Sequence, residues 1–346
     1  MKDFIIVGGG LAGICFAETA FLNNKSFVLI SDTSQNSSVV AAGLYNPVIL
    51  KRFSLPQDSK VHLEYMKPFY KTIEERLAIK FDFDLPVYRK FASIEEQNMW
   101  FEAADKPALE PFLLPKIIHT KYQYLPSPFG FGQVLHTGYV DTNVLLDGYH
   151  SSLKDQGNLL QETFVYDDLV VEDGFVSYRG IEAKHIVFAE GFGIHANPYF
   201  KYLPLDGTKG ELLIIKAPDL DLDVAVNSGV FMLPLGNDLY KVGATYEWYD
   251  KTPAITEAGK QELLEKLNEL ITCNYEVVNH LAGIRPTTKD RKCLIGTHPK
   301  YKNVHLLNGL GTRGVMLGPA MAKELYDSIA IGTPVRREIS LARFKI

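Results

Sequence analysis

A glycine-rich turn near the start of the chain limits its fold more than any other feature. Phe4–Val7 is a fully apolar run, rich in β-branched residues, of the kind that forms a strand buried on both faces of a parallel sheet. Gly8, Gly10 and Gly13 follow it in the spacing G-x-G-x-x-G. A second apolar run then ends at Asp32, 19 residues after Gly13. Strand, glycine turn, helix, strand and acid in this order predict a dinucleotide-binding βαβ unit.

Each part of this unit has a physical role. The first glycine turns the chain, the second lets a pyrophosphate approach the backbone, and the third lets the helix pack on the strand. Leu11 and Ala12 begin the expected helix, whose free N–H groups and positive dipole end would face the phosphates. Asp32 is expected to bind a ribose hydroxyl, and the alternative is an ordinary loop acid or a helix cap.

The same stretch shares some features with a secretion signal. Lys2 precedes a largely apolar run that extends to Ala17, about the length of a signal h-region. However, glycines interrupt the run after a few residues, and Glu18 lies on the helix that follows. No small-x-small cleavage site leads into a polar mature start, so we favour the nucleotide interpretation.

The composition is that of a soluble globular chain. Its 346 residues exceed what one hydrophobic core usually serves, so two domains are expected. Hydrophobic residues make up 46% of the chain, and no run of about 18 uncharged apolar residues predicts a membrane span. The net charge of −5 provides no overall attraction to nucleic acid. Three cysteines without C-x-x-C spacing predict a reducing compartment, hence the cytoplasm, and neither a disulfide framework nor a zinc site.

Two further units of strand and glycine loop lie far from the first. KHIVFAEGFG, at 184–193, indicates a buried strand that runs into glycine. NVHLLNGLGTRGVMLGPAMAKELYDSI, from residue 303, indicates a strand, a glycine-rich loop and a helix at 318–330. Other helices are expected at 59–80, 141–157 and 256–271, and LYKVGATYEWY is among the clearest strands of a β-rich stretch at 208–250.

These patterns predict an α/β fold with two domains. A Rossmann-like nucleotide-binding domain would be assembled from discontinuous segments, and a β-rich α+β domain would bind the substrate. We assign 1–75, 140–207 and 284–346 to the first domain, and 76–139 and 208–283 to the second. This division predicts a ligand site at the domain interface.

Several sequence blocks resemble a known family. In chain order they are VGGGLAGICFAETA, GYVDTNVLLDGYHSSLKDQG, VFAEGFG, GTKGELLII, LYKVGATYEW, LAGIRPTTKDRKCLIG and LNGLGTRGVMLGPAMAKEL. Their order is similar to that in the FAD-dependent amine oxidoreductases of the D-amino acid oxidase (DAO) superfamily, nearest the glycine oxidase and sarcosine oxidase branch. The last two blocks are the most specific, because many unrelated enzymes share the N-terminal glycine motif.

The resemblance implies a resident FAD, rather than NAD, with the glycine turn at its pyrophosphate and Asp32 at its adenosine ribose. Enzymes of this family pass a hydride equivalent from the carbon next to an amine to flavin N5, and water then hydrolyses the imine. The resemblance therefore implies a small amine or amino acid substrate with a carboxylate, and oxygen or another molecule as electron acceptor. The further residues implied to contact the cofactor are Ala42, Gly43, Leu44, Gly191, Gly311, Thr312, Arg313 and Gly314.

Arg285 is the first candidate for binding the substrate. Pro286 follows it and disfavours helix at Arg285, as expected for a strand or loop residue aimed into a cleft. A planar guanidinium can hold a carboxylate through two parallel hydrogen bonds, and the matching arginine of glycine oxidase-like relatives does so. The alternative is a structural salt bridge.

Three further residues are candidates on the strength of the resemblance. Arg313 would lie near the flavin ring among nearby glycines, or else be a solvated loop charge. Lys241 resembles the lysine thought to activate oxygen in sarcosine oxidases, with an exposed lysine as the alternative. Tyr246 matches a substrate-pocket position of glycine oxidase relatives, but on an unbroken strand it would face away from Lys241. Both can line one pocket only if a bulge or turn separates them.

Two positions depart from the family pattern. Phe231 occupies a place where glycine oxidase relatives carry a tyrosine that helps hold the substrate carboxylate, which puts simple glycine oxidation in doubt. Cys293 falls several residues later than the cysteine that attaches flavin covalently in sarcosine oxidases. We therefore expect non-covalent FAD and interpret Cys293 as a small buried hydrophobe.

Two other functions stay open. AGLYNP faintly resembles the FAD domain of the bifunctional enzyme that oxidises a carboxymethylaminomethyl group on modified tRNA uridine, and a basic rim at Lys51 and Arg52 would support that reaction. Against it stand the acidic pI and the absence of a methyltransferase domain. A flavin-binding protein without catalysis is the other alternative, which predicts that Arg285 is already paired. The histidines show no ligand spacing, so no metal is expected.

Overall fold

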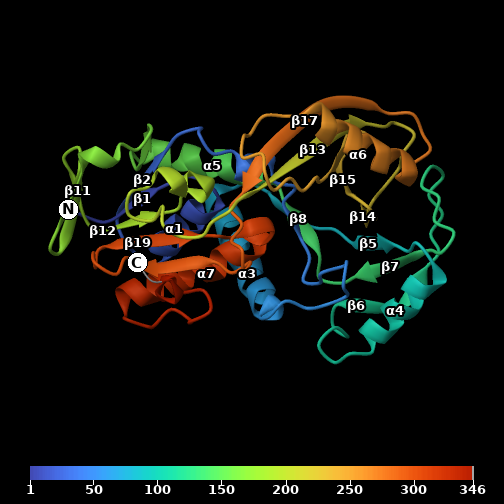
Figure 1. The fold of residues 1–346 in the computed structure, drawn as a ribbon, viewed down its shortest axis with the longest axis horizontal. Helices are drawn as coiled ribbons and strands as arrows, with labels where there is room; N and C mark the ends of the chain where they lie inside the picture. Colours follow the sequence, from blue (N-terminus) through green and yellow to red (C-terminus); the bar gives the residue numbers. More distant parts are fainter. Residues whose placement is uncertain (345–346) are drawn as a thin grey trace.

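An eight-stranded sheet organises the half of the molecule drawn at the left of Figure 1, in a computed structural model that describes residues 1–344. The strand order is β10-β11-β12-β1-β2-β9, with β19 paired to both β12 and β18. β1 runs parallel to β2 and β12, and β19 runs parallel to β12. The strands span Lys2–Val7 (β1), Phe27–Ser31 (β2), Leu159–Gln161 (β9), Leu169–Glu172 (β10), Phe175–Tyr178 (β11), Ile181–Phe188 (β12), Leu294–Thr297 (β18) and Val304–Asn308 (β19).

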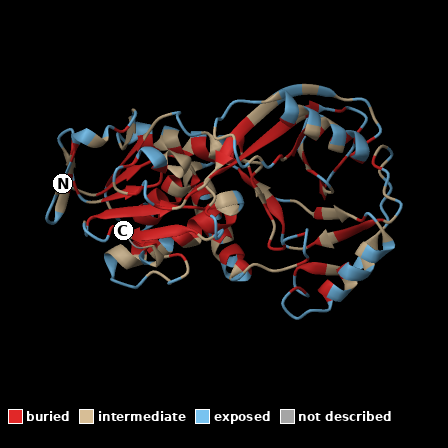
Figure 2. Cartoon of the chain, in the orientation of Figure 1, coloured by how far each residue is buried: buried red, intermediate tan, exposed pale blue. Residues whose placement is uncertain are grey.

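Both faces of the central strand are buried, as its apolar run predicts (Figure 2). Phe4 and Ile6 pack into the core shared with the helices, whereas Ile5 and Val7 pack into the core on the opposite face. Three separate parts of the chain contribute strands to this sheet, which confirms the discontinuous Rossmann-like arrangement. The helices of this half are α1 (Leu11–Leu22), α2 (Ser37–Val40), α3 (Ser59–Leu77), α5 (Thr142–Asp155) and α7 (Gly314–Ala330).

A second eight-stranded sheet forms the other half, in the order β17-β13-β16-β15-β14-β5-β7-β6. Its neighbours are antiparallel except for the parallel pair β14 and β5. Its strands span Val87–Lys90 (β5), Leu113–Ile118 (β6), Phe131–Val134 (β7), Thr208–Lys216 (β13), Ala225–Asn227 (β14), Phe231–Gly236 (β15), Leu239–Gly243 (β16) and Glu276–Arg285 (β17). Helices α4 (Ile94–Ala104) and α6 (Glu257–Leu270) pack against it, and a small sheet joins β3 (Leu44–Tyr45), β8 (Gly138–Val140) and β4 (Asp82–Asp84).

Local capping explains two of the predicted helices. The Asp141 carboxylate accepts the N–H groups of Asn143 and Val144, which fixes the start of α5. The Thr256 hydroxyl likewise accepts the N–H of Gly259 at the start of α6. The α/β fold class and the helices expected at 59–80, 141–157 and 256–271 are confirmed. The domain boundaries at 75, 139, 207 and 283 stay a prediction.

The last helix begins earlier than the predicted residue 318. α7 starts at Gly314, directly after a 3₁₀ turn at Gly311–Arg313, so Pro319 lies inside the helix. A proline there has no N–H to donate to the carbonyl of Val315. The Tyr70 hydroxyl on α3 donates to that carbonyl instead, at 2.7 Å. The sequence prediction failed because proline usually marks the first turn of a helix, and the replacement donor comes from a distant segment.

The strand expected over LYKVGATYEWY is also shorter than predicted. β16 ends at Gly243, where its pairing with both β13 and β15 stops. The chain then touches β13 again through Thr245 and Glu247. This break removes the alternation that would force Lys241 and Tyr246 to opposite faces of one strand.

Two structural features are not found among residues 1–344. No helix there is long and apolar enough to cross a membrane. No group of three or more His, Cys, Asp or Glu side chains is arranged to hold a metal ion.

Replacing Tyr70 with Phe tests the contact with α7. We expect Tyr70→Phe to lower the free energy of unfolding by about 1–3 kcal/mol, because the buried Val315 carbonyl loses its donor. In a Pro319→Ala background the new N–H of residue 319 can donate to that carbonyl, so the same Tyr70 change should cost clearly less. Urea unfolding of the four proteins measures both losses, and equal losses in the two backgrounds would contradict this account.

Candidate active site

A cavity of about 1250 Å³ lies between the two large sheets. One wall comes from the glycine turn after β1, the segment after β2, and the end of β12. The other wall comes from β13, β14, β15 and β17. Ligands in open α/β sheets bind outside the carboxyl ends of the parallel strands, and these ends meet here. The position agrees with the expected site at the interface of the two halves.

The glycine turn keeps some of its N–H groups free for a ligand. The Gly9 N–H donates to Ser31 Oγ at 3.1 Å, and the Leu11 N–H donates to Ser38 Oγ at 3.1 Å. Gly10 and Ala12 line the cavity, and no acceptor within residues 1–344 takes their N–H groups. The start of α1 therefore offers two unpaired donors and the positive end of its dipole to an anion.

The glycines of the turn are required for different reasons. Gly8 has a φ of +105°, and a Cβ at Gly13 would lie 1.8 Å from the Gly8 carbonyl oxygen. Gly13 accordingly does not line the cavity, and its role is the close packing of helix on strand. A Cβ at Gly10 would lie 3.0 Å from Ser38 Oγ, the end of a short side chain, and 3.8 Å from Ser38 Cβ. Protein packing alone thus gives little reason for a glycine at position 10, whereas a ligand close to the backbone does.

Asp32 lines the cavity and also stabilises its own loop. Its Oδ1 accepts the Ser34 N–H at 3.0 Å and the Ser34 hydroxyl at 2.6 Å. Burial raises the pKa of this carboxyl, but the hydrogen bonds from Ser34 outweigh burial and hold the pKa below its usual value. Asp32 therefore makes the contacts expected of a loop acid. Its binding of a ribose hydroxyl stays a prediction.

Glu190 is a cavity residue that the sequence interpretation missed. It follows β12 directly, and its carboxylate accepts from the Tyr166 hydroxyl and from Asn197 Nδ2. Burial, and to a smaller degree the charge of Asp32, raise the pKa of Glu190 to about 7. The signal was present in the sequence, because an acid at the end of a buried parallel strand lies at the same edge as the glycine turn.

Arg285 ends β17 on the opposite wall. Its guanidinium carbon lies 4.6 Å from the ring centroid of Tyr246, and a Cβ at Gly210 would lie 2.1 Å from its Nη2. Nη1 donates to the carbonyls of Lys209 and Thr245 at 3.4 and 3.3 Å. No carboxylate within residues 1–344 pairs with it, so the salt-bridge alternative is wrong. Burial lowers its pKa.

Two of the expected cations do not line the cavity. Lys241 is only 8% exposed, so the exposed alternative is wrong. Its ammonium donates to the carbonyl of Ala41, which does line the cavity, and burial lowers the lysine pKa. The half-buried Arg313 is not a fully solvated loop charge either, because its Nη1 is buried without an acceptor and burial lowers its pKa.

Most other expected positions do reach the cavity. Phe231 is on the lining, whereas the buried Cys293 is not, and burial raises the pKa of its thiol to about 12. Lys51 and Arg52 are exposed and lie outside the lining. The remaining expected residues on the lining are Gly8, Leu11, Ala12, Ala42, Gly43, Leu44, Gly191, Tyr246, Gly311, Thr312 and Gly314.

Comparison with known families finds one match over nearly the whole chain. The profile of the DAO family, described as FAD dependent oxidoreductase, matches residues 3–328. This match confirms the resemblance that the sequence blocks indicate.

Individual relatives agree with the family match. The glycine oxidase of Bacillus subtilis (strain 168) is 23% identical over 94% of this chain and 92% of its own. The crystal structure of glycine oxidase from Geobacillus kaustophilus superposes with a TM-score of 0.80 at 20% identity, covering 100% of this chain and 99% of that one. The tRNA 5-methylaminomethyl-2-thiouridine biosynthesis bifunctional protein MnmC of Legionella pneumophila is 25% identical over 99% of this chain, which spans 53% of that protein.

The cavity residues fit a resident FAD. Gly10 and Ala12 provide free N–H groups for a pyrophosphate, and position 10 leaves room for its approach. The backbone of Gly311, Thr312 and Gly314 lines the cavity beside the start of α7. A flavin ring placed there would lie between the two sheets, within reach of the wall that carries Arg285.

Two glycine substitutions separate flavin binding from folding. Gly10→Ala should fold normally but weaken FAD binding by at least about tenfold, because its methyl group occupies the space of the pyrophosphate. Gly13→Ala should lower the melting temperature even without flavin, because its methyl group meets the Gly8 carbonyl. Flavin absorbance per protein and thermal unfolding of the flavin-free proteins measure the two effects. A Gly10→Ala protein that binds as much FAD as wild type would contradict the binding of the pyrophosphate at the glycine turn.

Glu190 predicts a pH dependence of stability. Its folded pKa of about 7 lies above the unfolded value of 4.5, so its contribution is fully present below pH 4.5 and is lost as pH rises through 7. Glu190→Gln does not titrate, so its unfolding free energy relative to wild type should rise by about 2–3 kcal/mol between pH 5 and 8. Urea unfolding of both flavin-free proteins across this range gives the difference. Parallel pH profiles would show that the carboxyl does not titrate there.

Proposed function

The chain belongs to the DAO family of FAD dependent oxidoreductases, and from this premise we propose that it oxidises the carbon–nitrogen bond of a small amino acid or N-substituted glycine. The observation that supports this most directly is the state of Arg285. Its guanidinium is half-buried on the cavity wall and has no carboxylate partner among residues 1–344. Burying an unpaired charge costs free energy, and an anionic ligand would provide the missing partner.

In this proposal Arg285 binds the substrate carboxylate. The ring of Tyr246 lies against its guanidinium and Gly210 leaves room for it, so the nitrogens that do not donate to Lys209 or Thr245 can form two parallel hydrogen bonds. Fixing the carboxylate also fixes the carbon next to the amine, which is the orientation that hydride transfer needs. Phe231 adds an apolar surface where a hydroxyl would otherwise help with the carboxylate. That difference favours substrates with an apolar substituent over glycine itself.

The protein's own part in the reaction is positioning and electrostatics. Bound FAD supplies the two-electron acceptor for the hydride of the carbon next to the amine. No side-chain base is needed if the amine binds neutral, and water hydrolyses the imine after release. In the proposal, Lys241 and Arg313 act from behind the lining: Lys241 holds the Ala41 carbonyl, and Arg313 adds positive charge near the start of α7. The electron acceptor is oxygen or another oxidant.

A second candidate is oxidation of a carboxymethylaminomethyl group on a tRNA uridine. The similarity to the bifunctional tRNA protein over 99% of this chain supports it. The exposed pair Lys51 and Arg52 would serve as a contact for the nucleic acid, although it does not line the cavity. The non-catalytic alternative required a paired Arg285, and this pairing is not found within residues 1–344.

Anaerobic titration of the flavin-loaded protein tests the reaction. Glycine, sarcosine, D-alanine, D-proline and carboxymethylaminomethyl-uridine are added in turn while flavin absorbance is followed. Bleaching by one of the amino acids supports the first proposal, and bleaching by the nucleoside alone supports the second. Flavin that stays oxidised with every compound counts against both.

Replacing Arg285 tests the carboxylate role. Arg285→Ala should keep FAD while weakening carboxylate ligands by about 2–5 kcal/mol, because the partner charge in the cavity is lost. Arg285→Lys should recover part of that loss, since it keeps the charge without the bidentate geometry. Titration with acetate, followed by flavin absorbance, measures the affinity. A variant that instead unfolds and releases flavin would mean that the arginine is structural.

A further inference from the structure

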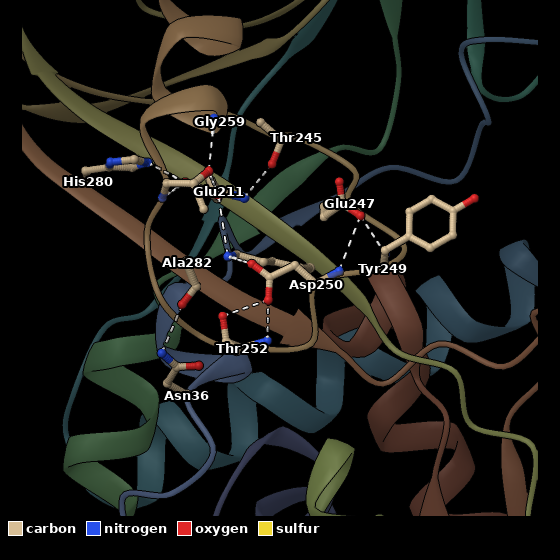
Figure 3. Close-up of polar contacts among 12 residues, drawn as sticks. Asn36, Glu211, Thr245, Glu247, Tyr249, Asp250, Thr252, Gly259, His280 and Ala282 are labelled. Carbon is tan, nitrogen blue, oxygen red and sulfur yellow. Dashed lines mark hydrogen bonds and ion pairs between the residues drawn. The ribbon is translucent and has the colours of Figure 1, made fainter.

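A cluster of charged and polar side chains surrounds a completely buried lysine on β13, the strand that pairs with β17 and Arg285. It consists of Lys209, Glu211, Asp250, Thr256 and His280, and Figure 3 shows the carboxylates at its centre. Lys209 is completely buried, with Nζ 2.5 Å from Asp250 Oδ2 and 3.7 Å from Glu211 Oε1. His280 Nε2 lies 2.8 Å from Glu211 Oε2. A fully buried ammonium is stable only when paired, so Asp250 is bound firmly to β13.

The cluster holds both ends of one segment, residues 244–256. Near its start, Lys209 and Glu247 exchange two backbone hydrogen bonds, at 2.9 and 3.0 Å. At its end, the Glu211 carboxylate accepts the Thr256 N–H at 2.9 Å and the Thr256 hydroxyl at 2.7 Å. Asp250, in the middle, accepts the Thr252 N–H at 2.8 Å while it pairs with Lys209. Adjacent parts of one strand therefore fix the whole segment.

Between these anchors the segment carries exposed aromatic side chains. Tyr246 is 59% exposed, Trp248 46% and Tyr249 92%. Such exposed side chains gain little from core packing, so the place of Tyr246 over Arg285 depends on its backbone. That backbone is held at Glu247 and Asp250 by Lys209.

Lys209 also contacts Arg285 itself. Its backbone carbonyl accepts from Arg285 Nη1, and the neighbouring Gly210 leaves the space that the guanidinium occupies. Lys209 thus provides both the ammonium that anchors the segment and the carbonyl that orients Arg285. Loss of the Lys209–Asp250 pair would release Tyr246 from one face of the guanidinium and admit water there.

We propose that the Lys209–Asp250 ion pair positions Tyr246 and Arg285 for carboxylate recognition. Lys209 is a positioning residue in this role, because it acts through Arg285. The inference rests on the proposed function, since it assumes that Arg285 binds a carboxylate. It assigns the ion pair to substrate affinity and leaves flavin binding and the electron-transfer step unchanged.

Asp250→Asn is the sharpest test of this role. The amide keeps an oxygen for the Thr252 N–H but removes the charge that faces Lys209. We expect the dissociation constant of acetate and the KM of the reacting amine to rise by about ten- to a hundredfold, with kcat at saturation and flavin content unchanged. Asp250→Glu, which restores the charge, should recover part of the affinity. Lys209→Met should match Asp250→Asn if it folds.

Fluorescence provides a readout that is independent of turnover. The chain has two tryptophans, of which Trp100 is buried and Trp248 lies on the segment. Acrylamide quenching therefore reports mainly on Trp248. Asp250→Asn should increase the quenching, and saturating acetate should reduce it more in wild type than in the variant.

A matched control separates positioning from stability. Arg336→Met breaks ion pairs with Asp58 and Glu324, and none of these three residues lines the cavity. It should lower the melting temperature without changing acetate affinity. An Asp250→Asn protein that melts lower yet binds acetate and quenches like wild type overturns the inference. A wild-type protein that binds neither acetate nor any amine of the panel removes the proposed function and, with it, this inference.

Discussion

The contact between Gly13 and the Gly8 carbonyl is the constraint on which the rest of the site depends. No side chain fits between them, so α1 lies directly against the end of β1. This contact brings the first N–H groups of α1 to the edge where β1, β2 and β12 end together. Ser31 and Ser38 then take the N–H groups of Gly9 and Leu11, and no acceptor in the described part of the chain takes those of Gly10 and Ala12.

The two walls of the cavity present different chemical groups to a ligand. The wall around the glycine turn presents backbone donors and a carboxyl, Glu190, whose pKa burial raises to about 7. The wall around β17 presents one guanidinium that has no charged partner among residues 1–344 and is contacted by two carbonyls and a tyrosine ring. The walls are joined at β17, where Asn36 Nδ2 donates to the Ala282 carbonyl at 3.0 Å (Figure 3). In the proposed function, the half that carries Arg285 recognises an anionic substrate and the half that carries the glycine turn binds the dinucleotide.

Much of this site was predictable because its signals are local. Each signal lies within a few residues of the feature that it determines. These signals are the glycine spacing, the fully apolar run of β1, the Asp141 cap and the proline after Arg285. The start of α7 was predicted wrongly because Tyr70, on another helix, supplies the bond that Pro319 cannot make. The burial of Lys241 was missed for the same reason, since its acceptor is the distant Ala41.

The sequence by itself determined the fold class, the family and the glycine turn after β1, because strand periodicity and glycine spacing act over short distances. Tertiary structure decided which charged side chains reach the cavity. It turned Arg313 away from the lining, placed Glu190 on it, and paired Lys209 with Asp250 across 41 residues of chain. These outcomes depend on side-chain direction and on contacts between distant segments, and neither is encoded in local spacing.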